Sequence, residues 1–188
     1  LNNTNFTCAN VGPNTVILTV TDACGNSSTC SATVTVQDLV PPVALCQALT
    51  INLGSSGNST VPAASIDNGS SDACGIASLS LNPNTFSCDD LGVNNVTLTV
   101  TDVNGNSSTC TATVSIQDNV NPIALCQNVT VQLDASGNGS TSAAAANNGS
   151  SDNCAIASLV LSQTSFNCGE VGPNTETLTV TDVNGNVR

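Results

Sequence analysis

Apolar and polar side chains alternate with a period of two along several short segments of the chain, and this alternation predicts β-strands. In residues 109–117 cysteine, alanine, valine and isoleucine alternate with threonine and serine, and residues 29–37 repeat the pattern. Residues 16–21, 96–101 and 177–181 are rich in β-branched side chains and alternate in the same way. Half-buried strands of this kind are typical of antiparallel sheets.

Further strands are expected where short apolar runs lie between turn-forming clusters of Gly, Asn, Asp and Ser, at residues 48–53, 59–64, 76–81 and 85–88. The alanine tract 143–146 aligns with the Pro62 segment of the preceding copy, so we expect a strand that runs into a loop there. Roughly seven short strands in a unit of this size predict an all-β fold, an immunoglobulin-like β-sandwich.

The same motifs recur along the chain with a period of 80 residues. Residues 18–38 and 98–118, for example, differ at only five of 21 positions. A fixed period of this length indicates tandem small domains, and arrays of near-copies favour a stalk, adhesin or fibre over a single catalytic pocket. We expect the C-terminal part of one repeat, a complete repeat, and a repeat that lacks its last strand, at residues 1–38, 39–118 and 119–188.

Large apolar side chains are scarce, because the chain has no Trp, Tyr or Met and only three phenylalanines, Phe6, Phe86 and Phe166. We expect each phenylalanine to fill the core of its own repeat. So small a core calls for covalent support. Nine of the ten cysteines recur in columns of the repeat, and neither a CxxC pair nor a histidine points to zinc. The cysteines therefore predict a disulfide framework and an oxidising compartment.

The four cysteines of the complete repeat allow three connectivities. We expect one bond to join the first and last strands and another to close a short middle loop, which gives Cys46–Cys110, Cys74–Cys88 and, in the next copy, Cys154–Cys168. The partners of Cys8, Cys30 and Cys126 are expected outside residues 1–188. For Cys24 a free thiol, an intermolecular bond and a local alternative pairing all stay open.

The charge balance is strongly acidic, with 13 Asp and Glu, one arginine, no lysine and no histidine, for a net charge of −12. Without a basic patch we expect binding neither to nucleic acid nor to anionic membrane surfaces. No apolar stretch is long enough to insert directly into a membrane. The chain has no His, Lys or Tyr, the residues that most acid–base and nucleophilic mechanisms use, so we expect no enzyme activity. The adjacent Asp89 and Asp90 fit a solvated turn better than a glycosidase pair.

The order of the motifs resembles a known family. Val-Thr-Asp-x-x-Gly-Asn leads into one cysteine-bearing strand, and Gln-Asp-x-x-x-Pro precedes another. Over the whole chain this is similar to the hyalin repeat (HYR) domain, and more closely to the HYR-like repeats of long cell-surface adhesins of Bacteroidota. The resemblance implies an extracellular, non-catalytic, immunoglobulin-like module with an adhesive or spacer role. Eukaryotic HYR units usually have Cys-Pro where this chain has Cys46-Gln47, which favours the bacterial repeats.

Acidic residues recur in the loops of each repeat. In an immunoglobulin-like sandwich the chain entry, the B–C loop and the F–G loop lie at one end, so these carboxylates should converge there. Calcium takes about six to eight oxygen ligands of this type, and we expect Ca²⁺ at each junction between repeats. The expected ligands are Asp38, Asp72 and Asp102 at one junction and Asp118, Asn119, Asp152 and Asp182 at the next. Alternatively, these residues only form turns by bonding their own backbone.

Together these features predict a cell-surface structural module that acts as a rigid spacer or adhesive stalk. Its expected partners are neighbouring repeats, identical chains, surface glycans or other cells. One alternative is a filament subunit in which a strand of a neighbouring chain completes residues 119–188, since residues 27–38 hold a strand of that type. A longer polypeptide explains the same open repeat. A second alternative, a glycan-binding module, is disfavoured by the scarcity of aromatic side chains.

Overall fold

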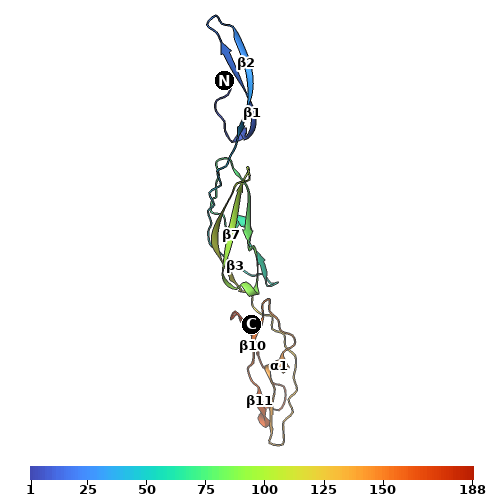
Figure 1. Ribbon diagram of the computed structural model, residues 1–188. Helices are drawn as coiled ribbons and strands as arrows, with labels where there is room; N and C mark the ends of the chain where they lie inside the picture. The colour runs from blue at the N-terminus through green and yellow to red at the C-terminus, as the bar shows by residue number, and fades with distance from the viewer. The chain divides into compact units, whose positions relative to one another are not determined.

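The computed structural model describes all residues 1–188, and strands make up most of its regular structure, as predicted (Figure 1). Contacts between Cα atoms group the chain into two compact units. Unit 1 consists of Leu1–Ala48, Pro62–Asn82 and Asn95–Ala112, and unit 2 consists of Leu49–Val61, Pro83–Asn94 and Thr113–Arg188. None of the helices is long and apolar enough to cross a membrane. The division into repeats of 80 residues stays a prediction.

Antiparallel strand pairs form most of unit 1. β1 (Gly12–Thr21) and β2 (Ser27–Val36) make a hairpin with a continuous register. β5 (Ile76–Asn82) pairs with β7 (Gly92–Asp102). On β7 the buried positions alternate with threonines, as the period of two predicts, and they carry three apolar side chains with 1% exposure or less, Val96, Leu98 and Val100.

One strand pair runs in a direction that the sequence did not predict. β3 (Leu49–Asn52) is parallel to β8 (Ser107–Gln117), whereas only antiparallel sheets were expected. β3, β8, β7 and β5 are neighbours in that order. β3 and β8 are the first and last strands of residues 39–118, so no hairpin turn joins them and their relative direction is free. Residues 39–118 hold six strands, where about seven were expected.

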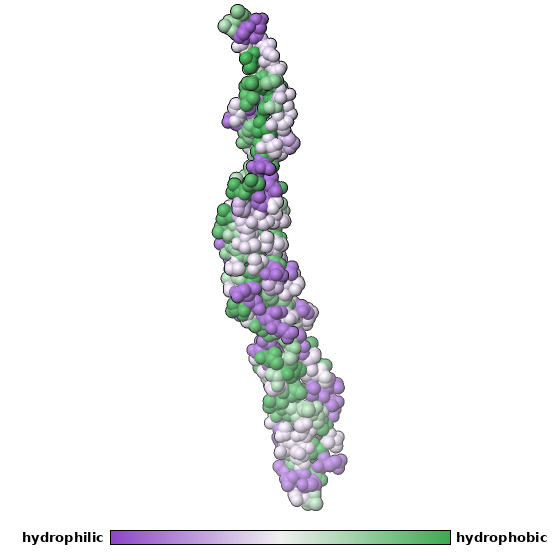
Figure 2. Space-filling view, in the orientation of Figure 1, coloured by the Kyte–Doolittle hydropathy of each residue, from purple (hydrophilic) through white to green (hydrophobic).

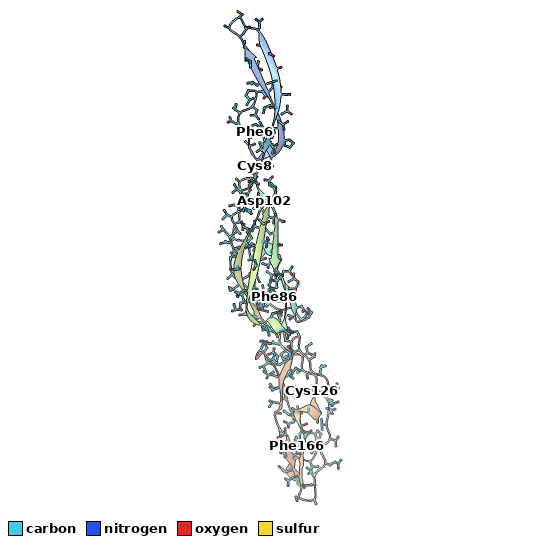
Figure 3. The ribbon with its side chains drawn as sticks, viewed as in Figure 1. Phe6, Cys8, Phe86, Asp102, Cys126 and Phe166 are labelled. Carbon is cyan, nitrogen blue, oxygen red and sulfur yellow. A yellow bond between two sulfur atoms is a disulfide. The ribbon has the colours of Figure 1, made fainter.

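A small second sheet buries one of the three phenylalanines. β4 (Asn58–Thr60) pairs with β6 (Thr85–Ser87), and Phe86 on β6 is only 3% exposed. Phe6 and Phe166, labelled with it in Figure 3, are half-buried. The expected aromatic core side chain is therefore present within residues 39–118, while the phenylalanines of residues 1–38 and 119–188 are partly exposed.

Residues 119–188 contain short strands and one helix. β9 (Asn138–Ser140) pairs with β11 (Ser165–Asn167), and β10 (Ile156–Leu161) pairs with β12 (Leu178–Asp182). The alanine tract, expected to be a strand, forms helix α1 (Ala143–Ala146). Alanine has the highest helix propensity, and the hydroxyl of Ser142 accepts the Ala145 N–H at 3.2 Å, which caps the first turn. The aligned residues of the preceding copy form the 3₁₀-helix η2 (Ala63–Ser65), where a strand to residue 64 had been expected.

A short 3₁₀-helix begins at the same cysteine column in each copy: η1 (Cys8–Asn10), η3 (Cys88–Asp90) and η4 (Cys168–Glu170). Its third residue caps the turn. The Ser87 N–H donates to Asp90 Oδ2 at 2.8 Å, which is the capping-box arrangement. Asp90 thus has a local structural role, in line with the interpretation of Asp89 and Asp90 as a turn.

Of the three predicted disulfides, one is present and the other two are wrong. Cys46 pairs with Cys110, as expected. Cys74 pairs with Cys8 instead of Cys88, and Cys154 pairs with Cys88 instead of Cys168. Their Cα atoms are 5.1 and 5.4 Å apart, within the range that a disulfide spans.

The expected Cys74–Cys88 bond fails because of where the intervening strands go. β5 carries the chain about 23 Å from its start beside Cys74, at roughly 3.3 Å per residue. β6 then pairs with β4 instead of folding back along β5, so Cys88 does not return to Cys74. The bonds Cys8–Cys74 and Cys88–Cys154 each join residues 66 positions apart, from one predicted repeat to the next. A loop of this length stabilises the folded state by about 4 kcal/mol in the chain-entropy account.

Four cysteines remain free and exposed: Cys24, Cys30, Cys126 and Cys168. Many apolar side chains are exposed as well, among them Val43 and Leu45 and their counterparts Ile123 and Leu125. Figure 2 shows apolar and polar residues interspersed over the face in view.

Candidate functional site

Three carboxylates meet in unit 2. Asp118 directly follows β8, Asp152 lies in the loop before β10, and Asp182 ends β12. Strand pairing brings the last two together, because Ile156 at the start of β10 lies opposite Asp182. One carboxylate oxygen from each of the three lies within 4.8 Å of the others. The structure therefore assembles the acidic set that the repeat pattern predicted for this junction, which we call the Asp118 cluster.

Asp182 is held by its own hairpin. Its Oδ1 accepts the N–H groups of Asn184 and Asn186 at 2.9 and 2.8 Å, and its Oδ2 accepts the Asn186 amide at 2.7 Å. The side chain is only 2% exposed. Burial alone would raise the pKa of Asp182, but these hydrogen bonds favour the charged form and hold the pKa below its ordinary value.

The other members of the cluster keep buried oxygens without a donor. Asp118, 6% exposed, accepts the Val120 N–H and the Asn153 amide through Oδ1, while its Oδ2 has no hydrogen-bond partner. Asp152 accepts the N–H groups of Cys154 and Ala155 through Oδ2, while its Oδ1 has none.

Asn153 joins the cluster to a neighbouring turn. Its amide donates to Asp118 Oδ1 at 3.1 Å and to the carbonyl of Gly54 at 3.3 Å, and its buried Oδ1 has no partner. This asparagine was not among the expected ligands. One difference between the copies could have pointed to it, because the same position of the preceding copy is Ala73.

The Cys88–Cys154 bond lies directly beside Asn153. Cys88 Sγ is 3.5 Å from the Asn153 carbonyl oxygen and 3.6 Å from that of Gly57. Gly57 has a φ of +73°, and a Cβ added there would meet the Asn153 carbonyl oxygen at 2.6 Å. Only glycine fits this turn, because any side chain would collide with backbone.

The equivalent residues of unit 1 are arranged differently. Asp38 and Asp72 lie close together, but the third member of their group is the sulfur of Cys74, which is in a disulfide and offers no thiolate. Asp102, expected to join them, is not in this group; its carboxylate accepts N–H groups of its own hairpin, including that of Asn104 at 2.8 Å. The expected three-aspartate site is therefore absent from this junction.

Asn119, the remaining expected ligand, is exposed, and its amide donates to Asn52 Oδ1 at 2.7 Å. At the first junction the Asn104 amide donates to Asp38 Oδ2 at 2.8 Å, so that oxygen already has a partner. The two junctions thus share a sequence pattern but differ in which oxygens are free.

A groove of about 880 Å³ also lies in unit 2, lined among others by Val131, Phe166 and Leu178. Its two acidic side chains are used locally, since Glu170 accepts the Asn167 N–H and Glu176 accepts the Ser162 hydroxyl. Phe166 is the one aromatic ring in its lining.

No family model matches the chain, and no curated protein matches it.

Proposed function

We propose that this chain is a non-catalytic structural part of an extracellular, cell-surface adhesin or fibre. In this proposal it consists of tandem immunoglobulin-like repeats of the HYR-like kind and serves as a rigid spacer or adhesive stalk. The observation that carries the proposal is the pair of disulfides Cys8–Cys74 and Cys88–Cys154. Both have a sequence separation of 66 and link a 3₁₀-helix of one predicted repeat to the loop before the middle strand of the next.

A spacer must keep its length when it is pulled, and the disulfide pattern supports this. The loops closed by the three disulfides overlap in sequence, since Cys46 precedes Cys74 and Cys88 precedes Cys110. Every residue from Cys8 to Cys154 therefore lies inside at least one covalent loop. Tension applied along the chain is carried from repeat to repeat by covalent bonds that bypass most of the folded residues.

The remaining chemistry agrees with an exposed structural role. Disulfides form and persist in oxidising surroundings. The absence of lysine, with Arg188 the only arginine, leaves no internal site for trypsin-like proteases. The buried aspartates Asp102 and Asp182 bond the backbone of their own hairpins, which is structural use of an acid.

Intact cells that produce the protein test the localisation directly. An antibody raised against residues 39–118 should label them without permeabilisation, and proteinase K should remove the label. Labelling that requires permeabilised cells would contradict an extracellular role. A glycan array probed with the purified chain addresses the glycan-binding alternative, for which Phe166 is the one ring in the groove.

A second candidate, a filament subunit completed by an identical chain, is favoured by one observation. Leu49–Asn52 pairs with β8, but its counterpart, residues 129–132, forms no strand, and Cys126 nearby is free. β2 carries the free Cys30 at the position that Cys110 holds in β8. Oligomers linked by Cys30 and Cys126 on a non-reducing gel would support this candidate, and a monomer at high concentration would count against it.

A further inference from the structure

The strongest unexplained feature outside the disulfides is a set of buried oxygen atoms with no hydrogen-bond donor. They belong to three adjoining side chains and are Asp118 Oδ2, Asp152 Oδ1 and Asn153 Oδ1. Buried polar atoms are nearly always paired, so a group of three at one place indicates a missing partner. Since all three are acceptors, the missing partner must be a donor or a cation.

The charges at this place favour a cation over a neutral donor. Asp118, Asp152 and Asp182 hold three carboxylates within 4.8 Å of one another, and two of them are buried. The chain has no lysine or histidine, and its one arginine is Arg188. Like charges at this separation repel strongly where water is excluded. The three carboxylates have no balancing positive side chain of their own to offset this repulsion.

We propose that the Asp118 cluster binds one Ca²⁺ ion, with carboxylate oxygens of Asp118, Asp152 and Asp182 and the amide oxygen of Asn153 as ligands. Backbone carbonyls and water complete the shell. All four side chains offer hard oxygen, the ligand type that calcium prefers. Cys154 next to them is in a disulfide, so no thiolate is present to favour zinc.

The ligand set favours calcium over magnesium. Mg²⁺ usually keeps several waters and is held by only one or two carboxylates, whereas Ca²⁺ takes six to eight oxygens in a flexible shell. The three carboxylates lie within 4.8 Å of one another, close enough to share one ion. Asp182 is also fixed by its bonds to the hairpin, so only part of the site must move to close around an ion.

The first junction serves as an internal control because the same repeat pattern lacks the site there. Its third group member is the disulfide sulfur of Cys74, and Ala73 stands where the second junction has Asn153. Asp38 Oδ2 already accepts the Asn104 amide at 2.8 Å. Figure 3 labels Asp102, which is outside the group. We therefore infer one calcium ion for the whole chain and none at the first junction.

Isothermal titration calorimetry of the oxidised full chain with CaCl₂ tests this inference. We expect one ion per chain, a weaker response to MgCl₂, and a calcium-dependent rise in the unfolding temperature. Asp152→Asn should weaken binding at least tenfold, because it removes a charge and a ligand oxygen. Asn153→Ala, which copies the first junction, should also weaken it, while the matched variant Asp72→Asn should bind as the parent does.

Mass-spectrometric detection of the Cys88–Cys154 bond in each variant shows that it has folded. The inference is overturned if the parent binds no calcium at 10 mM by the same titration, or if Asp72→Asn loses binding as Asp152→Asn does. Calcium binding is measured on the purified chain and does not depend on the structural role, so either proposal can fail without the other. If it holds, the ion connects Asp118, the last residue of one predicted repeat, to two loops of the next.

Discussion

The disulfide pattern makes a quantitative prediction about how far the chain can be stretched. In the oxidised chain a pulling force enters at Leu1, crosses from Cys8 to Cys74, follows the backbone to Cys88 and crosses to Cys154. Only about seven residues before Cys8, 14 between Cys74 and Cys88 and 34 after Cys154 can then extend. At roughly 3.5 Å per residue these 55 or so residues reach about 190 Å, against about 650 Å for the reduced chain.

The perturbation is the double variant Cys88→Ser with Cys154→Ser. It forces the load from Cys74 back along the backbone to Cys46, across the remaining disulfide to Cys110 and on to Arg188, so about 113 residues extend and the limit rises to about 400 Å. The matched control removes Cys46 and Cys110 instead. Because that bond is not on the shortest covalent path of the oxidised parent, the limit should stay near 190 Å even though a disulfide of similar loop length is lost.

Single-molecule force spectroscopy with handles at the two termini measures these limits, before and after reduction. The four free cysteines, Cys24, Cys30, Cys126 and Cys168, are replaced by serine in every protein to prevent exchange. If every disulfide were confined to a single repeat, Cys74 would pair with Cys88 and Cys154 with Cys168, and Cys46–Cys110 would stay as it is. The oxidised parent would then extend to a limit of about 380 Å. That value, or a longer limit in the control than in the parent, would refute the proposed transfer of tension across repeats.

Three further predictions concern stability, each measured by urea unfolding of the oxidised chain. Gly57→Ala should lower the free energy of unfolding by about 2–3 kcal/mol, since the added Cβ would collide with a backbone oxygen at 2.6 Å. Gly69→Ala is the control, because Gly69 has a similar φ of +85° but no atom within 4 Å of the added Cβ, and it should lower the free energy of unfolding by about 1 kcal/mol. Equal losses in the two variants would contradict the packing argument. Leu98→Ala should lower the free energy of unfolding by roughly 3–5 kcal/mol, because the Leu98 side chain is 0% exposed. A loss under about 1 kcal/mol would show that this side chain is not packed in the core. Hydrogen bonds, first that of the Ser70 side chain, hold the pKa of Asp67 below its ordinary value of 3.8, so the folded state binds fewer protons than the unfolded state in acid. The resulting stability is present above pH 3.8 and is lost as the pH falls through the lower, folded-state pKa; Asp67→Asn should therefore lose less stability than the parent between pH 5 and pH 2.5, and an identical pH profile would count against this.

Much of the local structure could be predicted because strands and hairpins depend on neighbouring residues. The alternation in residues 96–101 and 109–117 placed β7 and β8, and Cys46–Cys110 followed from the expectation that the first and last strands are close. The alanine tract was misjudged by analogy with the preceding copy, where proline precedes the aligned residues. Its own helix propensity, with Ser142 as cap, decides the local structure.

The sequence by itself determined the strand pattern, the 80-residue period and the acidic columns, because these are properties of spacing along the chain. Tertiary structure alone decided that Cys74 pairs with Cys8 and that β3 runs parallel to β8, since both depend on segments far apart in sequence. It also decided the difference between the two junctions. Asp118 and Asp38 occupy equivalent positions, but only around Asp118 do three carboxylates meet with buried oxygens left without donors. The physical reason is that a hydrogen bond or a disulfide forms between atoms brought within a few ångströms in space, and repeat spacing does not specify those distances.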